Sequence, residues 1–311
     1  MKKFTRLSLL ALLLLVLAAC GVQSKASENE KLVIKIGYLP ITHAAPLFLQ
    51  DEEEYENYEI ELVKFGSWPE LMDALNTGRI DGASVLIQLA MKAKEKGIDL
   101  KAVALGHRDG NVLVVSPEIN SVEELKGETF AIPNRFSTHN VLLYQMLKQN
   151  GVAYEDLNVI ELAPAEMPAA LAEGRIAGYV VAEPFGAISV ALEKGKVLYQ
   201  SEEVWKDSID CGLVLHNRFI EENEELAKQF VQDYAQAGEV AHIGDEHAHA
   251  VIGKHINVED EVLDLSLEWI SYDNLKIEED SYAILTESLI EMGLSKEPPS
   301  YEDFVNTSFI E

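Results

Sequence analysis

The feature that most constrains the fold of this chain is a phrase of sequence that occurs twice. LMDALNTGRIDGASV occupies residues 71–85 and MPAALAEGRIAGYVV occupies residues 167–181, with Ala, Leu, Gly, Arg, Ile, Gly and Val at matching places. In each copy a helix-like segment stops at a glycine and an apolar run follows, which predicts helix, turn and strand. The repetition predicts that one structural unit is present twice.

The segments around the two copies also follow one order. Short apolar strands alternate with amphipathic helices in 31–105 and again in 126–199, and the last helix of each set ends in Glu-Lys-Gly. Alternation of this kind predicts parallel strands joined by right-handed crossovers. We therefore expect an α/β protein with two lobes, each a mostly parallel sheet flanked by helices.

Two further apolar runs, 111–116 and 212–216, can carry the chain from one lobe to the other and back. Residues beyond 220 have the apolar stripe of helices. We expect the first lobe, with a helical C-terminal part packed mainly on it, to comprise 31–118 and 208–311, and the second lobe 119–207. Ligands of open α/β sheets bind beyond the carboxyl ends of the strands, so two facing lobes predict a cleft that closes on a solute.

The N-terminus has the pattern of an export signal. Lys2, Lys3 and Arg6 precede an apolar run at 7–17, which is too short to span a bilayer, and Leu-Ala-Ala-Cys20 follows. This end resembles a bacterial lipobox. The resemblance implies a signal peptide at 1–19, a lipid on Cys20, a polar tether at 20–30 and attachment to the extracytoplasmic face of the cell membrane. An uncleaved membrane anchor is the alternative.

Composition and motifs exclude several classes of protein. The net charge of −28 argues against a nucleic-acid partner. The chain has none of the common nucleotide-binding, nucleophile-elbow, zinc-protease or Cys-x-x-Cys motifs, so we expect no enzyme and no cofactor. Cys211 lies in an apolar run and is expected to be a buried small hydrophobe. The histidines of 242–255 are spaced by five, two and six residues, which does not place them on one helix face, so we expect no metal site.

Polar residues in the loops after the predicted strands are the candidate ligand-binding residues. They are Thr42, His43, Trp68, Ser84, Gln88, Ser137, Thr138, His139 and Glu183. The segment 133–140 is the strongest, because hydroxyls, an imidazole and the free amides of a helix start can together bind an oxyanion.

Six of these candidates have a structural alternative. Thr42 and Ser137 can simply cap helices, while His43 and His139 face solvent. Trp68 can belong to the core. Glu183 can be a carboxylate stabilised by a helix N-terminus.

Several segments of the sequence resemble those of a known protein family. IGYLPITHAAPL, ALNTGRIDGA, FSTHN followed by LL, GYVVAEPF, and MGL with PSYEDF near the end are similar to the nitrate/sulfonate/taurine/bicarbonate solute-binding proteins of ABC importers. The resemblance implies a periplasmic-binding-protein fold of the second structural type. It also implies a monomeric, lipid-anchored protein that captures a small anionic solute in the cleft and delivers it to an ABC permease and its ATPase.

The resemblance leaves the ligand open. Glu183 weighs against nitrate, whereas bicarbonate, with or without a metal, tolerates a carboxylate better, and a sulfonate is also compatible. A pyrimidine precursor of thiamine, or a role as a receptor for a sensor protein, are further alternatives. An enzyme of pyrimidine synthesis shares this fold, but the export signal argues against it.

Overall fold

The computed structural model describes residues 31–310, so the predicted signal peptide, Cys20 and nearly all of the tether lie outside the described residues. Residues from Val33 onward form one compact unit. Within the described residues, no helix has the length and apolar character needed to cross a membrane.

The first sheet has five strands in the order β2-β1-β3-β11-β4. The strands are β1 (Leu32–Tyr38), β2 (Tyr58–Lys64), β3 (Gly82–Leu86), β4 (Leu100–Leu105) and β11 (Cys211–His216). Strand β1 is parallel to β3, whereas β11 is antiparallel to both of its neighbours, β3 and β4. A strand that arrives from the second half of the chain is therefore inserted, reversed, into the sheet of the first half.

The second sheet also has five strands, in the order β10-β6-β9-β7-β8. The strands are β6 (Asn111–Val115), β7 (Thr129–Ile132), β8 (Asn158–Glu161), β9 (Gly178–Ala182) and β10 (Lys196–Gln200). Strand β7 is parallel to β8 and β9, and β6 is antiparallel to β9 and β10.

The two sheets have the same topology. When β1 to β4 are matched with β7 to β10, and β11 with β6, the two strand orders are identical. This confirms the predicted α/β fold with mostly parallel sheets. One boundary differs, because β6 falls in the range 31–118 expected for the first lobe but pairs in the second sheet. The chain passes from the first sheet to the second and later returns. Each time, the first strand that it adds to the new sheet, β6 or β11, is the reversed one.

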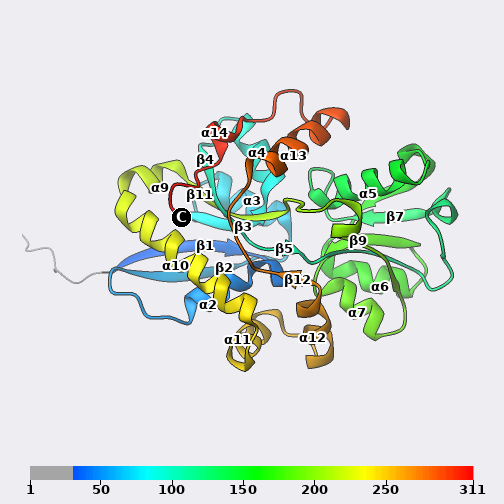
Figure 1. The fold of residues 1–311 in the computed structure, drawn as a ribbon, viewed down its shortest axis with the longest axis horizontal. Helices are drawn as coiled ribbons and strands as arrows, with labels where there is room; N and C mark the ends of the chain where they lie inside the picture. Colours follow the sequence, from blue (N-terminus) through cyan, green and yellow to red (C-terminus); the bar gives the residue numbers. More distant parts are fainter. Residues whose placement is uncertain (1–30, 311) are drawn as a thin grey trace, which may run out of the picture. The chain divides into compact units, whose positions relative to one another are not determined.

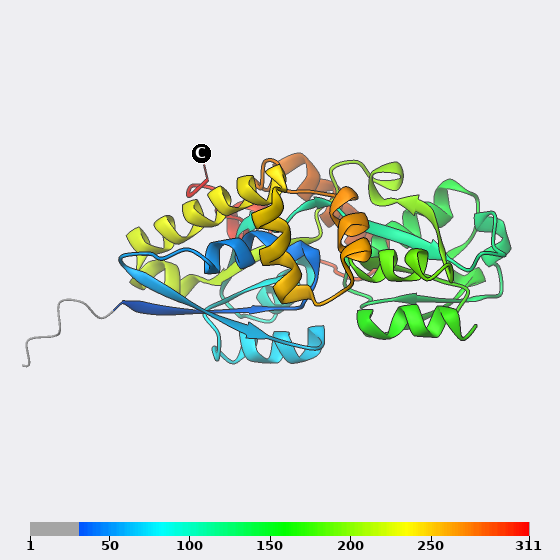
Figure 2. The ribbon, with the colours of Figure 1, turned by 90° about the horizontal axis from the view of Figure 1, so that it is seen from below.

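Helices cover both faces of each sheet. In the first half, α2 and α10 lie on one side of β1 and β2, and α3 lies on the other (Figure 2). In the second half, α5 lies on one side of the sheet, and α6 and α7 lie on the other (Figure 1). The bounds are α2 (Ala45–Asp51), α3 (Trp68–Asn76), α4 (Ile87–Glu95), α5 (Thr138–Gln149), α6 (Met167–Ala172), α7 (Phe185–Ala191), α8 (Ser201–Val204) and α10 (Glu224–Ile243).

The C-terminal part is helical, as the sequence predicts, but it contacts both halves. Helix α12 packs against α7, and α13 packs against α5. Strands β5 and β12 pair in a short two-stranded sheet. The remaining elements are β5 (Arg108–Asp109), β12 (Ile270–Ser271), α9 (Asn217–Glu222), α11 (Glu246–Ile256), α12 (Asp260–Glu268), α13 (Glu279–Glu291), α14 (Tyr301–Phe304) and the 3-10 turns η2 (Thr42–Ala44), η3 (Val122–Leu125), η4 (Tyr154–Asp156) and η5 (Pro164–Glu166).

The repeated phrase encodes a turn and a close approach of two strands. Gly78 and Gly174, just after α3 and α6, both have a φ of +68°, which favours glycine. A Cβ on Gly82 would lie 2.6 Å from the carbonyl oxygen of Val214 in β11, and one on Gly178 would lie 2.8 Å from that of Val114 in β6. The second glycine of each copy thus gives the reversed strand room to pair.

The arginine of each copy lies at the surface. Arg79 pairs with Asp73 at 2.5 Å and Arg175 pairs with Glu173 at 2.7 Å, and all four side chains are more than half exposed. Such exposed pairs contribute little to stability. The shared phrase is therefore scaffold, and its two arginines serve neither the core nor a buried site.

Three serines precede helical segments, and only one of them caps its helix through the side chain. Ser137 caps α5, as predicted, with its Oγ accepting a hydrogen bond from the amide of Asn140 at 3.2 Å. Ser67 is the N-cap residue of α3, but its side chain makes no capping bond. Ser121 introduces only the 3-10 turn η3 and also makes no capping bond.

Candidate functional site

Two buried histidines follow the carboxyl ends of β1 and β4. His43 lies in η2, and its Nε2 is 3.1 Å from the carbonyl oxygen of Gly110. The Nδ1 of His107 is 2.7 Å from the carbonyl oxygen of Asp109. A carbonyl oxygen only accepts, so these nitrogens carry the ring protons. In the neutral rings, Nδ1 of His43 and Nε2 of His107 therefore present lone pairs, which is how carbonyl partners orient metal-binding histidines.

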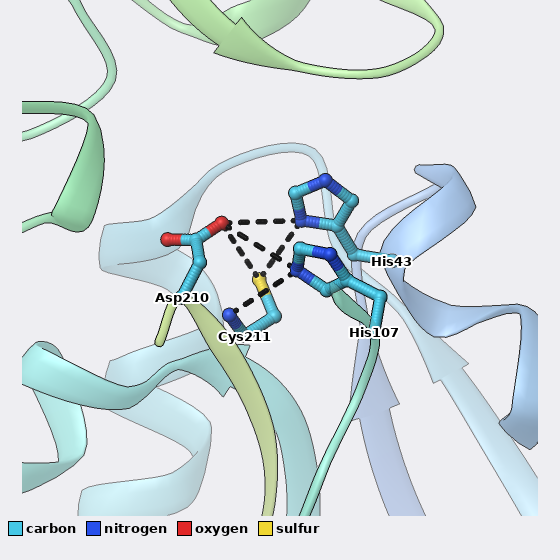
Figure 3. Close-up of side chains that lie close together, drawn as sticks. All are labelled: His43, His107, Asp210 and Cys211. Carbon is cyan, nitrogen blue, oxygen red and sulfur yellow. Dashed lines mark hydrogen bonds and ion pairs between the residues drawn. The ribbon is translucent and has the colours of Figure 1, made fainter. Parts of the chain in front are cut away.

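Both lone pairs face the side chains of Asp210 and Cys211, at the start of β11 (Figure 3). Oδ2 of Asp210 is 3.2 Å from Nδ1 of His43 and 3.7 Å from Nε2 of His107. Sγ of Cys211 is 3.4 Å from Nδ1 of His43 and 3.8 Å from Oδ2 of Asp210. All four residues are buried, and their four ligand atoms lie within 4.8 Å of one another. We call these four residues the His-Asp-Cys cluster.

The second half of the chain contributes His139, in the first turn of α5. Its Nδ1 is 3.7 Å from Oδ1 of Asp210, the carboxylate oxygen that does not face His43 and His107. The His139 side chain is fully buried, and neither of its ring nitrogens has a hydrogen-bond partner within residues 31–310; Oδ1 of Asp210 has none either. Buried polar atoms are nearly always paired, so these atoms are candidates for contact with a ligand.

The charges of the cluster suit a cation. Burial and the neighbouring His43 lower the pKa of His107 to about 4, and burial lowers the pKa of His139. Burial alone would raise the pKa of Asp210, but His139, His107 and His43 outweigh it and hold that pKa well below its usual range. At neutral pH, an ionised carboxylate therefore faces uncharged His107 and His139.

Thr42 and Glu183 join the two halves instead of facing the cluster. The amide and hydroxyl of Thr42 donate to the carbonyl oxygen of Glu183 at 3.0 and 3.2 Å. The carboxyl of Glu183 accepts from the amide of Ala187 at 2.9 Å and from Ser266 at 3.2 Å. Burial raises the pKa of Glu183 to about 8, so this carboxyl holds a proton at neutral pH. These contacts agree with the structural alternative for Glu183 given above, a carboxyl group held at the start of a helix.

The other predicted residues are buried, but they are not part of the His-Asp-Cys cluster. Gln88 donates to the hydroxyl of Thr138, which in turn donates to the carbonyl oxygen of Ile209, so this pair also links the halves. Trp68 and Ser84 are buried, and their Nε1 and Oγ atoms lack partners within residues 31–310. Ser137 is occupied by capping.

Sequence reasoning missed His107 and Asp210 as site residues. His107 follows the carboxyl end of β4 just as His43 follows that of β1, so the rule that selected His43 could have selected it too. Asp210 stands before a strand, and its place became apparent only because β11 is reversed. The prediction that Cys211 is buried in the apolar run is confirmed, but its sulfur also faces the polar cluster.

The histidines of 242–255 are dispersed. Helix α10 ends at Ile243, before the segment that holds most of them. His249 pairs with Asp264 at 2.9 Å, and His255 stacks on Phe48. These rings have separate partners and do not converge.

Residues 27–257, well over half of the chain, match the model of the NMT1-like family. The chain belongs to the NMT1-like family. A crystal structure of the ligand-binding component of an ABC-type import system from Staphylococcus aureus, with zinc bound, is 43% identical, with a TM-score of 0.85 over 90% of this chain and 98% of that one. The nitrate/nitrite binding protein NrtA of Nostoc is 25% identical over 69% of this chain and 55% of the relative.

The fold is shared more widely. The periplasmic aliphatic sulphonate binding protein SsuA from Escherichia coli has a TM-score of 0.72 at 22% identity, over 85% of this chain and 94% of that one. The first curated relatives are longer, since the chain spans only 30% to 58% of their length. The predicted periplasmic-binding-protein fold and the predicted family are confirmed. The binding proteins among these matches are not enzymes, which supports the expectation of a non-enzymatic protein.

Proposed function

We propose that this chain is the solute-binding component of an ABC importer and that its cargo is a divalent transition metal ion of the zinc class. The observation that carries the proposal is the convergence of the Asp210 carboxylate with Nδ1 of His43 and Nε2 of His107, the two ring nitrogens that present lone pairs. Hydrogen bonds from the Cys211 amide to Nε2 of His107 at 3.5 Å and from the Asn111 side chain to Oδ2 of Asp210 at 3.2 Å reach these acceptors, but neither donor is a cation that balances the buried carboxylate. A metal ion satisfies all of them at once.

The distances from the Asp210 carboxylate to the two histidines are close to those of a zinc site. Zinc binds imidazole nitrogen and carboxylate oxygen at about 2.0–2.2 Å in tetrahedral sites, so neighbouring ligand atoms are about 3.3–3.5 Å apart. Oδ2 of Asp210 lies 3.2 and 3.7 Å from the two histidine nitrogens, close to these separations. The two imidazoles are stacked with their centroids 3.4 Å apart, so the rings have to separate by about 2 Å to bind one tetrahedral ion. Imidazole donors suit zinc, copper and nickel better than magnesium or calcium.

The family supports the proposal. The Staphylococcus aureus protein, 43% identical, was solved with zinc bound. Its similarity extends over 90% of this chain. Relatives that are named as components of import systems support a role in import.

A small oxyanion, such as nitrate, bicarbonate or an alkanesulfonate, is the second candidate. It is favoured by buried donors without partners, namely Nε1 of Trp68, Oγ of Ser84 and the ring of His139. The Asp210 carboxylate opposes it, because within residues 31–310 no lysine or arginine pairs with that carboxylate to attract an anion. We therefore place an oxyanion second, alone or as a companion of the metal. A pyrimidine precursor and a receptor role have no contact that favours them.

The rest of the proposal concerns location and delivery. We infer that the signal at 1–19 is removed, that a lipid on Cys20 attaches the protein to the extracytoplasmic face, and that 20–30 tethers a monomer able to reach an ABC permease and its ATPase. The N-terminal pattern and the names of the relatives support this inference. Mass spectrometry of the membrane-associated protein tests it: the mature N-terminus should be a lipid-modified Cys20, and an unmodified Met1 would contradict it.

A thermal-shift experiment tests the cargo. Zinc added to chelator-treated protein, at about 1,000 times its Kd, should raise the melting temperature by about 10 °C. Nitrate, bicarbonate or sulfonate alone should leave it unchanged. His43→Ala and His107→Ala should lose the zinc response, whereas the surface variant His249→Ala should keep it. A response to an anion without any response to zinc would reject the metal in favour of the oxyanion.

A further inference from the structure

The three ligands of the proposed metal site leave the fourth tetrahedral position open, and two side chains lie close enough to be considered for it. Cys211 begins β11 of the first sheet, and His43 and His107 follow strands of that sheet, whereas His139 comes from α5 in the other half. A soft sulfur donor and a borderline imidazole nitrogen select different metals. The identity of the fourth ligand therefore determines which cargo the protein prefers.

The backbone holds Cys211 rigidly. It is the first residue of β11, opposite Leu86 in the antiparallel pairing with β3. Its carbonyl oxygen accepts a hydrogen bond from the amide of Gly106 at 2.8 Å, on the side of β4. The side chain is fully buried. With a strand on either side, the position of its Sγ is set by the sheet, which suits a ligand that must be in place before the metal arrives.

The position of Sγ fits the fourth vertex. With a zinc–sulfur bond of about 2.3 Å, a tetrahedral site separates sulfur from its nitrogen and oxygen neighbours by about 3.5 Å. Sγ of Cys211 is 3.4 Å from Nδ1 of His43 and 3.8 Å from Oδ2 of Asp210. In Figure 3 the sulfur lies between the two imidazoles and the carboxylate.

His139 approaches the carboxylate from its other oxygen. Its Nδ1 is 3.7 Å from Oδ1 of Asp210, whereas His43 and His107 both face Oδ2. A donated N–H from His139 to Oδ1 would orient the carboxylate and satisfy two unpaired atoms without entering the tetrahedron. Orientation of a ligand through a hydrogen bond of this kind is common around metals.

We propose that Sγ of Cys211 is the fourth metal ligand and that it makes the site prefer zinc-class ions to manganese, magnesium and calcium. The inference rests on the proposed function. As the metal–sulfur bond forms, the thiol proton leaves to solvent, so the loaded site holds a thiolate, a carboxylate and two neutral imidazoles. Thiolate ligands favour zinc and similar metals, while manganese, magnesium and calcium favour oxygen.

Cobalt provides the test, because its absorption spectrum reports both geometry and ligand type. The full chain loaded with Co²⁺ should show the strong visible bands of a tetrahedral site together with a sulfur-to-cobalt charge-transfer band in the near ultraviolet. Cys211→Ser should lose the near-ultraviolet band, and its zinc affinity should fall at least tenfold, while its manganese affinity changes by less than threefold. Cys20, the only other cysteine, is common to both proteins.

His139→Ala is the matched control, since it removes the rival donor and should retain the near-ultraviolet band. A wild-type spectrum that is tetrahedral but has no such band, or that Cys211→Ser leaves unchanged, overturns the role of Cys211 while keeping the metal site. Loss of the band in His139→Ala with its retention in Cys211→Ser assigns the position to His139. Failure of the wild-type protein to bind cobalt or zinc overturns the proposed function itself.

Discussion

The two sheets of this protein share one topology but differ in the chemistry at their strand ends. His43 follows β1 and His139 follows β7, the matching strand of the second sheet. His43 has one nitrogen bound to the carbonyl of Gly110, while both nitrogens of His139 lack partners within residues 31–310. The first half thus holds a preformed site, and the second half offers a side chain that can respond to its occupation.

The difference extends to the carboxyl groups. Asp210 of the first sheet is buried among histidines and ionised, whereas Glu183, which follows β9 in the second, is buried and protonated at neutral pH. The duplicated scaffold supplies the same backbone twice, and the residues that the copies do not share decide what each half does. Function is here a property of the strand-end loops and not of the fold.

The largest expected effect concerns Glu183. Its folded pKa of about 8 lies above the unfolded value, so the native state binds this proton more tightly. The associated stability is fully present below about pH 4.5 and is lost as the pH rises through 8, by up to about 5 kcal/mol. Glu183→Gln, which cannot ionise, should lose much less stability between pH 5 and 9 in urea unfolding. Parallel curves for the two proteins would show that Glu183 does not hold a proton in the native state.

The next effect concerns the other carboxyl. Asp210→Asn keeps the shape of the side chain but removes the negative charge and a metal ligand, so zinc affinity should fall about a thousandfold, or about 4 kcal/mol. Calorimetric titration measures this. A control, Asp264→Asn, alters the surface partner of His249 and should leave the affinity unchanged. Equal zinc affinity in Asp210→Asn and wild type would place the metal elsewhere.

The shared scaffold predicts matched effects in the two halves. Gly82→Ala and Gly178→Ala would each push a Cβ against the carbonyl oxygen of a reversed strand. Each should lower the free energy of unfolding by about 3 kcal/mol, as overpacking of a core does. Chemical denaturation measures both. A neutral effect at either position would show that the two sheets tolerate the reversed strand differently.

The smallest effect should come from His139, the contribution of the second half. His139→Ala leaves the ligands of the first sheet in place, so zinc should still bind, about tenfold more weakly. Small-angle scattering should then show less compaction on zinc addition than in the wild type, because the contact from the second half is missing. Complete loss of zinc binding would show that His139 is an essential ligand, so that the first half alone would not hold the metal.

Much of the fold is predictable from the sequence, because the repeated phrase and the alternation of strands and helices are local signals. The rule that ligands lie at strand ends also identifies His43 and His139. The rule does not identify Asp210 and Cys211, because a hydrophobic pattern does not give the direction of a strand. Only the reversed direction of β11 brings its first residue to the edge where the other strands end. Sγ of Cys211 and Nδ1 of His43 meet from positions 168 residues apart, a contact that no local pattern encodes.

In the proposed function, the strand ends of the first sheet hold a zinc-class cargo. The most direct measurement is anomalous X-ray scattering at the zinc edge from crystals of the zinc-loaded protein. We expect one strong peak about 2.0–2.3 Å from Nδ1 of His43, Nε2 of His107 and Oδ2 of Asp210. A peak only at the surface, for instance beside His249 and Asp264, or no peak at all would contradict it.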